Sequence, residues 1–268
     1  MNEDDLKFKM ERLTSAIKGY NSLAIAFSGG ADSTFLLAVA HKALKRNVIA
    51  ITAKSQVHPE RETDLAVNYT NKHGIEHIII QSNELNIPEF TANNRDRCYI
   101  CKRNLFPRMM KAASERGIRD LAHGANTDDL KDFRPGFSAA NELGIAAPMI
   151  DAGLSKQDIR ILSKKMRLGT WNKPSMACLA TRIPYGTPVT KESLKMIEEA
   201  EYAMADLGFG TCRVRHHGTL ARIELASEEF ERMIKEKMRK SIVGKMKKAG
   251  YLYVSMDLEG YIQGSMNR

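Results

Sequence analysis

The strongest constraint on the fold is an apolar strand that runs directly into a glycine-rich loop and then into a helix. The run SLAIAF at 22–27 predicts a fully buried strand, the loop SGGADS follows at 28–33, and TFLLAVAHKAL at 34–44 has helical character. The same alternation of strand and helix continues to residue 81. Because consecutive parallel strands need crossover helices, we expect an α/β protein with a doubly wound parallel sheet.

The C-terminal third has a different pattern. The stretch 170–188 contains three prolines and little periodicity, which predicts an ordered loop. We therefore place the domain boundary there, with a large domain at 1–182 and a small α+β domain at 183–268. Apolar periodicity predicts the other elements. The expected helices are 6–17, 60–72, 99–116, 191–207 and 228–248. The expected strands are 47–52, 77–81, 120–124, two strands within 212–225, and a closing pair at 250–257 and 260–265, with a strand or turn at 147–150.

Composition narrows the class of protein. The chain has 268 residues, 43% of them hydrophobic, and a formal net charge of +9, which favours anionic partners without separating nucleic acids from nucleotides. The most basic run, at 235–248, alternates with apolar residues at helical spacing and is interpreted as a solvated helix face. No apolar stretch approaches the roughly 20 residues of a membrane helix, and the acidic N-terminus lacks a signal peptide's apolar segment, so we expect a cytoplasmic protein without a membrane partner.

The loop at 28–33 is suited to binding an anion. Glycines between a buried strand and a helix let backbone N–H groups converge on an anion at the positive end of the helix. The loop lacks the lysine of P-loop kinases and the GxGxxG spacing of dinucleotide folds. Asp32 would repel a polyphosphate unless Mg²⁺ lies between them or the carboxylate organises the loop. The alternative is an ordinary helix start that uses Ser and Asp as caps.

SGGADS resembles the SGGxDS signature of the PP-loop ATP pyrophosphatases, which have the adenine nucleotide α-hydrolase-like fold and split ATP between its α and β phosphates. The resemblance implies two sets of ATP-binding residues. The pyrophosphate set is Ser28, Gly29, Gly30, Asp32 and Ser33. The set bordering adenosine is Ala26, Phe27, Thr52, Ala53 and Lys54. The loop GANTDD at 124–129 is similar to the family's GxNxDD segment, which makes Asp128 a candidate Mg²⁺ ligand, although Asp128 and Asp129 suit a helix cap equally well.

The cysteines are too few for a disulfide scaffold. Cys98 and Cys101 form a CxxC among cationic residues that favour thiolates, a pattern compatible with a redox pair, half a zinc site or two ligands of an iron–sulfur cluster. Cys178 lies in a proline-stiffened loop with Lys173 and Arg182, which we expect to stabilise a thiolate that acts as nucleophile or ligand. A small buried thiol is the alternative for Cys178. Cys212, at the start of a strand, is expected to be a packing residue.

The block KPSMACLATRIPYG at 173–186 closely resembles the KPxxACLxSRIPYG block of the LarE family. RCYICK, DFRPG at 132–136, TWNKP, RVRHHGTLARIEL and GSMN extend the resemblance over most of the chain. LarE proteins are ATP-dependent sulfur transferases that adenylate a carboxylate of pyridinium-3,5-biscarboxylic acid mononucleotide and convert it to a thiocarboxylate for the nickel-pincer cofactor. The resemblance thus implies ATP and Mg²⁺ as cofactors, a mononucleotide substrate and a homo-oligomer.

The three cysteines indicate the branch of the family. Some members have only the equivalent of Cys178 and sacrifice its sulfur. Because Cys98 and Cys101 are also present, this chain resembles the branch in which three thiolates hold a [4Fe–4S] cluster and one iron stays open for sulfide. We therefore expect catalytic transfer from sulfide or another sulfur donor, with sacrifice of Cys178 as the alternative.

A pair of adjacent strands predicts an anion clamp. Alternation along a strand puts Arg213 and Arg215 on one face and Val214 on the other, while Arg222 and Glu224 share a side of the next strand. Resemblance to LarE suggests that the arginines bind the substrate phosphate; solvated surface arginines are the alternative.

Three other functions fit part of the pattern. A tRNA thiolase also pairs a PP-loop with a three-cysteine cluster, but it would need an RNA-binding module, and none is evident, so nucleic acid is not an expected partner. A synthetase that uses ammonia would leave the loop around Cys178 without a purpose. A nucleotide-binding regulator would do no chemistry.

Overall fold

The computed structural model describes residues 3–131, 135–174, 177–262 and 264–267. These residues form two compact units. The first unit comprises Met1–Ser55, Glu60–Ser82 and Asp96–Met176, and the second comprises Gln56–Pro59, Asn83–Arg95 and Ala177–Arg268. Two short segments of the chain therefore belong to the second unit before the C-terminal part forms the rest of that unit. The domain boundary expected after residue 182 remains a prediction.

The first unit is built on a parallel sheet of β1 (Leu23–Ala26), β2 (Val48–Lys54), β3 (Glu76–Gln81) and β4 (Leu121–His123). The strand order is β3-β2-β1-β4, which confirms the doubly wound α/β fold. The helices of this unit are α1 (Glu3–Lys18), α2 (Ala31–Leu44), α3 (Glu60–His73), α5 (Arg97–Ser114), α6 (Pro135–Glu142), α7 (Pro148–Asp151) and α8 (Lys156–Lys165).

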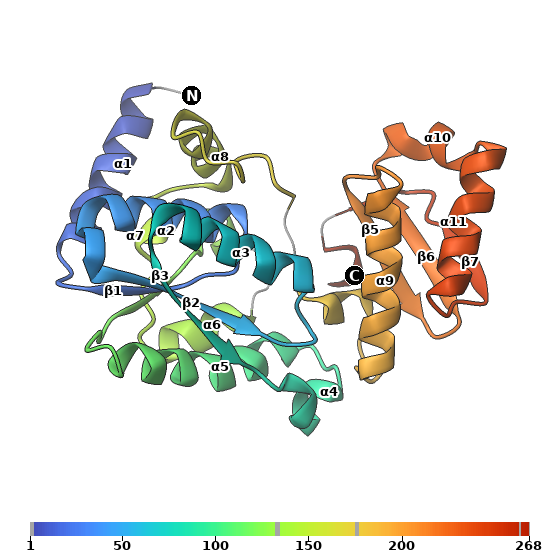
Figure 1. Cartoon of the computed structure of the whole chain (residues 1–268), viewed down its shortest axis with the longest axis horizontal. Helices are drawn as coiled ribbons and strands as arrows, with labels where there is room; N and C mark the ends of the chain where they lie inside the picture. The colour runs from blue at the N-terminus through green and yellow to red at the C-terminus, as the bar shows by residue number, and fades with distance from the viewer. Residues whose placement is uncertain (1–2, 132–134, 175–176, 263, 268) are drawn as a thin grey trace. The chain divides into compact units, whose positions relative to one another are not determined.

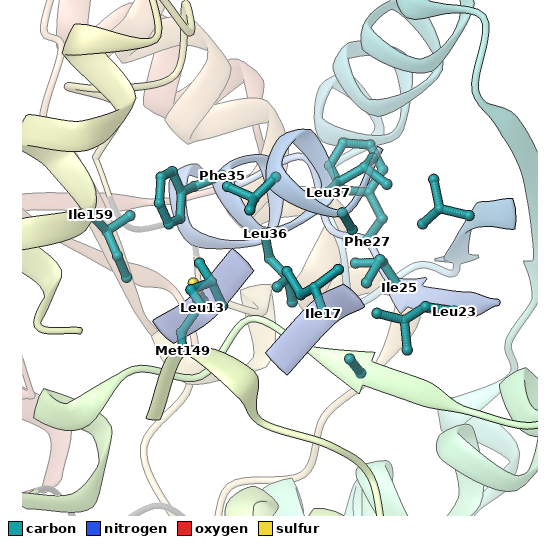
Figure 2. Close-up of a cluster of buried hydrophobic side chains, with 14 of the residues drawn as sticks. Leu13, Ile17, Leu23, Ile25, Phe27, Phe35, Leu36, Leu37, Met149 and Ile159 are labelled. Atoms are coloured by element: carbon teal, nitrogen blue, oxygen red, sulfur yellow. The ribbon is translucent and has the colours of Figure 1, made fainter. Parts of the chain in front are cut away.

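Helices cover both faces of this sheet, with α2 and α3 on one side and α5 and α6 on the other (Figure 1). Two apolar cores follow from this layering. On the α2 side, residues of α1, α2, β1 and α8 form one cluster, in which Leu13 and Leu36 are fully buried (Figure 2). On the α5 side, Phe106 and Met109 pack against Ile49 and Ile51. Strands buried on both faces explain the near-continuous apolar runs in the sequence.

The chain reverses its winding direction between β1 and β4. β2 and β3 lie on one side of β1, and the chain then returns to add β4 on the other side. In such sheets, ligands bind outside the carboxyl ends of the two strands at the reversal. The two loops that leave these ends touch, because a Cβ added to Gly124 would lie 3.0 Å from the Ser33 nitrogen and 3.1 Å from its Cα. The glycine-rich loop and the loop after β4 thus form one packed edge.

The second unit is a small α+β structure. Its sheet contains β5 (Cys212–His217), β6 (Leu220–Leu225) and β7 (Tyr253–Met256), with β5 and β6 antiparallel and β7 parallel to β6. Its helices are α4 (Pro88–Thr91), α9 (Lys191–Asp206), α10 (Phe230–Ile234) and α11 (Glu236–Lys248). Short 3₁₀ helices in the chain are η1 (Lys45–Asn47), η2 (Glu84–Asn86), η3 (Thr127–Lys131), η4 (Leu179–Arg182), η5 (Ser227–Glu229) and η6 (Ser265–Asn267).

One expected strand is wrong. The segment 260–265 contains no strand among its described residues, because Gly260 and Gly264 have φ angles of +74° and +79°, outside the extended region. Near 147–150 the chain forms the helical turn α7, which begins at Pro148. Within the described ranges, none of the helices combines the length and apolar character that a membrane crossing requires.

The contact between Gly124 and Ser33 makes a testable prediction. Gly124→Ala should lower the free energy of unfolding by about 1–3 kcal/mol, because the new methyl group meets backbone atoms that cannot rotate away. Gly169→Ala is the matched control, since an added Cβ there meets no heavy atom within 4 Å. We expect this control to stay within about 0.5 kcal/mol of wild type. Urea unfolding of both variants makes the comparison, and equal losses would contradict the packed edge.

Candidate active site

The glycine-rich loop has the backbone geometry of an anion cradle. Gly29 has a φ of +70°, which favours glycine, and Gly30 is the N-cap residue of α2. Because Gly30 has no side chain to bind the N–H groups of the first turn, they are suited to binding an anion. The Ser33 hydroxyl lies 3.0 Å from that of Ser28 and accepts the Ser28 N–H at 3.3 Å. These serines therefore brace the loop and do not act as ordinary helix caps.

A hydrogen-bond chain joins the carboxyl ends of β1 and β2. The Thr52 hydroxyl donates to the Phe27 carbonyl at 2.6 Å, so the His77 Nε2, 2.7 Å away, must donate to Thr52. The other ring nitrogen of His77 lies 2.9 Å from the Thr70 hydroxyl. Burial lowers the pKa of His77, which favours the neutral ring. The Phe27 side chain is 2% exposed, so only its backbone can border a nucleotide.

The rest of the expected adenosine set lies along the same edge. Ala26 ends β1 and is partly buried, and Ala53 is buried in β2. Lys54 ends β2 and pairs with Glu60 at 3.2 Å, an exposed contact of little energetic value. The edge is therefore held together mainly by the Thr52 hydrogen bonds.

Lys173 binds this loop. Its ammonium donates to the Gly29 carbonyl at 3.0 Å and to the Glu62 carboxylate at 2.6 Å. The side chains of Lys173 and Glu62 are only 15% and 14% exposed. The lysine that the sequence associated with Cys178 thus anchors the beginning of its segment to the cradle. Glu62, 111 positions away, gave no signal in the sequence.

The acidic residues after β4 bind backbone N–H groups. Asp128 accepts from Lys156, the first residue of α8, at 2.8 Å, and Asp129 accepts from Asn126 at 3.0 Å. Capping is therefore one role of Asp128. Asp32 and Asp128 leave neighbouring strands at the same edge of the sheet, and they offer the oxygen ligands that Mg²⁺ prefers.

His123, the last residue of β4, is a partly buried group that the sequence did not indicate. Its ring lies between Phe106 and Phe137, each with its centroid 6.0 Å away. Burial and, to a smaller extent, the charge of Lys102 lower the pKa of His123 to about 4. His123 is therefore neutral near pH 7 and adds no positive charge beside the reversal of the sheet.

Cys98 and Cys101 lie near the start of α5, one turn apart on the same side of the helix. Cys98 is exposed and Cys101 is buried. Gly136 packs closely here, since its added Cβ would lie 3.4 Å from the Cys98 carbonyl oxygen. The preceding part of the DFRPG motif, 132–134, lies outside the described residues.

Cys178 belongs to the second unit, just before η4; Ser175 and Met176 of the same motif lie outside the described residues. Arg182 is fully buried, donates to the carbonyls of Ala177 and Cys178 at 2.8 and 3.2 Å, and pairs twice with Glu201 at 2.9 Å. Burial opposes its charge, but Glu201 and, to a smaller extent, Cys178 raise the pKa of Arg182 above its ordinary value. A permanently charged arginine thus fixes the backbone at Cys178.

The expected clamp is a network of charged side chains in which Arg215 and Glu224 are buried. Arg215 and Arg222 both bind Glu224, at 2.6 and 3.1 Å, and Arg222 also pairs with Asp257 at 3.3 Å. The Arg213 guanidinium lies 5.2 Å from the ring centroid of Tyr261 and donates to the carbonyl of Cys212. Burial of its guanidinium lowers the pKa of Arg213.

The opposite face of the β5–β6 hairpin confirms the predicted alternation of side chains along the strands. Val214 and Ile223 lie in the core of the second unit. Cys212 lies in the same core, where burial raises its pKa, which confirms its packing role.

The arginine network and the Cys178 loop are connected within the second unit. Arg215 donates to the Thr181 carbonyl at 3.2 Å, and the Thr181 hydroxyl donates to the Cys178 carbonyl at 2.7 Å. The sequence placed these groups 37 positions apart without showing whether they meet. The structure brings the Cys178 backbone to the arginine face.

Among the described residues, no three His, Cys, Asp or Glu side chains are grouped as a metal site. Cys98 and Cys101 belong to the first unit, whereas Cys178 belongs to the second.

Comparison with known proteins places this site in a family. The family described as "Queuosine biosynthesis protein QueC" matches residues 22–187. The pyridinium-3,5-bisthiocarboxylic acid mononucleotide synthase of Lactiplantibacillus plantarum, a LarE protein, is 32% identical over 98% of this chain and 95% of its own. The chain belongs to the LarE family of PP-loop proteins. As a LarE protein it is an ATP-dependent sulfurtransferase.

Two further relatives match the chain over different lengths. An uncharacterised protein of Synechocystis is 38% identical to the present chain, over 98% of both chains. The glutamine-hydrolysing GMP synthase of Aeropyrum pernix is 24% identical over 68% of this chain and 39% of its own. The LarE-type similarity therefore extends through both units, whereas the GMP synthase shares only part of the chain.

The ion pair beneath Cys178 makes a second prediction. Glu201→Gln should cost about 3–5 kcal/mol of unfolding free energy, because it leaves Arg182 charged and buried without a carboxylate. Glu199→Gln on the same helix is the matched control, since the Glu199–Lys195 pair is exposed and 3.8 Å long. It should change stability by less than about 0.5 kcal/mol. Thermal unfolding that shows similar losses in both variants would contradict the role of Arg182.

Proposed function

We propose that this LarE protein adenylates a carboxylate of pyridinium-3,5-biscarboxylic acid mononucleotide and converts it to a thiocarboxylate. The relative from L. plantarum, matched over nearly its whole length, supports this substrate. The observation that carries the proposal is the hydrogen-bonded connection of the Cys178 loop to a buried arginine network. That connection offers an anion site and a sulfur atom in one unit, as thiolation of an anionic substrate requires.

The first step is activation of the carboxylate. A carboxylate oxygen attacks the α-phosphorus of ATP, the bond to the bridging oxygen breaks, and pyrophosphate leaves. The N–H groups at Gly30 and in the first turn of α2 stabilise the departing anion. Asp32 and Asp128 would hold Mg²⁺, which neutralises phosphate charge when it is bound.

The substrate phosphate is assigned to the arginine network. Arg215 and Arg222 bind Glu224, and Arg213 lies on the same face of β5 as Arg215. Guanidiniums gathered in this way favour an anion that can accept several charged hydrogen bonds. Glu224 holds two of the guanidiniums in place before the substrate arrives.

Cys98, Cys101 and Cys178 supply three thiolates, the ligand set that would hold a [4Fe–4S] cluster and leave one iron open. When bound, such a cluster would supply sulfide for repeated transfer.

The alternative sulfur source is Cys178 itself. Its thiolate would attack the acyl carbon and displace AMP, which gives a thioester. Removal of the Cα proton of Cys178 would then break the Cβ–Sγ bond, which leaves dehydroalanine in the chain and the sulfur on the product as a thiocarboxylate. This route allows a single turnover. We favour the cluster route because Cys98 and Cys101 would otherwise have no part in the reaction.

A tRNA thiolase remains the rival with the same chemistry. It differs in its substrate, and the buried arginine network of the second unit is better suited to one small anion than to an extended RNA backbone. A synthetase that uses ammonia, as the similarity to part of GMP synthase suggests, would need no thiol at Cys178.

Exchange of labelled pyrophosphate into ATP tests the proposal. Exchange should depend on the pyridinium biscarboxylate mononucleotide and persist in Cys178→Ala, because activation needs no thiol, whereas thiocarboxylate formation should disappear. Cys212→Ala, which removes a packing thiol, is the control and should retain both activities. Exchange stimulated by tRNA but not by the mononucleotide would overturn the substrate assignment.

Protein mass after turnover separates the sulfur sources. With iron and sulfide present, the mass should be unchanged over several turnovers. A loss of about 34 Da, the mass of H₂S, at Cys178 after one turnover would establish the sacrificial route instead.

A further inference from the structure

The salt bridge between Lys173 and Glu62 is largely buried and has no role in the mechanism described above. Both side chains are about 85% buried, and their contact is 2.6 Å. The lysine makes a second bond, of 3.0 Å, to the carbonyl of Gly29 in the cradle. A salt bridge that served stability alone would not need this backbone contact.

The contact with Gly29 determines the direction of a neighbouring N–H group. In a planar trans peptide the carbonyl and the N–H point in opposite directions. The peptide that carries the Gly29 carbonyl also carries the Gly30 N–H. When Lys173 holds the carbonyl on one side, the N–H must point to the other side, away from the ammonium.

The peptide between Gly29 and Gly30 needs such a restraint. Rotation of a peptide between two glycines meets the least steric resistance in the chain. The hydrogen bond from the Gly30 N–H to the Ser28 hydroxyl is long, at 3.4 Å. A charge-assisted hydrogen bond from Lys173 is stronger than that contact and can decide the orientation.

We propose that Lys173 is a positioning residue that holds the peptide between Gly29 and Gly30 with its N–H directed at pyrophosphate. Glu62 holds the lysine ammonium in place through the 2.6 Å contact. The inference rests on the proposed function, because it assumes that the cradle binds the pyrophosphate end of ATP. Since Lys173 precedes Cys178 by five residues, the same contact also fixes the start of the segment that leads to the sulfur.

Calorimetric titration with Mg²⁺-pyrophosphate tests the proposal with three variants. Lys173→Met should weaken binding about tenfold or more, because the Gly29 carbonyl loses its donor. Glu62→Gln should weaken it less than about threefold, because Lys173 still reaches Gly29. The double variant leaves no unpaired buried charge and should fold like wild type, yet it should bind as weakly as Lys173→Met.

Lys165→Met is the matched control, because Lys165 forms an exposed pair with Glu3 and should not affect binding. Restored binding in the double variant would overturn the inference, since Lys173 would then merely neutralise Glu62. Binding that weakens equally in Glu62→Gln and Lys173→Met would also overturn it. Failure of the wild type to bind pyrophosphate would instead refute the proposed function.

A ligand-free measurement distinguishes positioning from direct contact with phosphate. In protein labelled with ¹⁵N-glycine, the Gly30 amide resonance of the double variant should differ from that of wild type before any ligand is added. An unchanged Gly30 resonance together with weak binding would show that Lys173 acts on the anion itself, and the positioning role would be wrong.

Discussion

The close packing of Gly124 against the backbone of Ser33 is the contact on which the first unit's site depends. A doubly wound sheet brings the ends of β1 and β4 together, but only a residue without a side chain fits here, because a Cβ on Gly124 would lie 3.0 Å from the Ser33 nitrogen. The cradle, Asp32 and Asp128 are all positioned by this edge. Lys173 completes it from the other side by holding Gly29. The anion site is thus a property of the backbone, with side chains that fix its orientation.

In the second unit, buried charged side chains position the site, whereas in the first unit glycines do so. Arg182 with Glu201 and Arg215 with Glu224 are removed from water, which is costly unless each charge keeps its partner. These pairs also donate to the backbone of 177–181, so the loop at Cys178 has a defined conformation before substrate binds. The cost of burying them is consistent with a site that must bind an anionic substrate and keep a thiolate in position.

Much of the fold could be predicted because its signals are local. Buried strands flanked by helices gave the order of the first unit, and the alternation of Arg213, Val214 and Arg215 gave the two faces of the hairpin. Pairings between distant segments had no such signal. The contacts of Lys173 with Glu62 and Gly29 had no signal in the sequence, and Glu201, Asn93 and His123 gave no pattern at all. The segment 260–265 was read as a strand because apolar alternation does not reveal positive φ at glycine.

The central claim is that a carboxylate is activated as its adenylate before sulfur reaches it. The most direct measurement uses substrate with ¹⁸O in both carboxylates and follows the label by mass spectrometry of the released AMP. The account predicts one ¹⁸O atom in each AMP, because the oxygen that joins the acyl group to phosphorus leaves with AMP when sulfur attacks. AMP without ¹⁸O, or ADP as the nucleotide product, would contradict it.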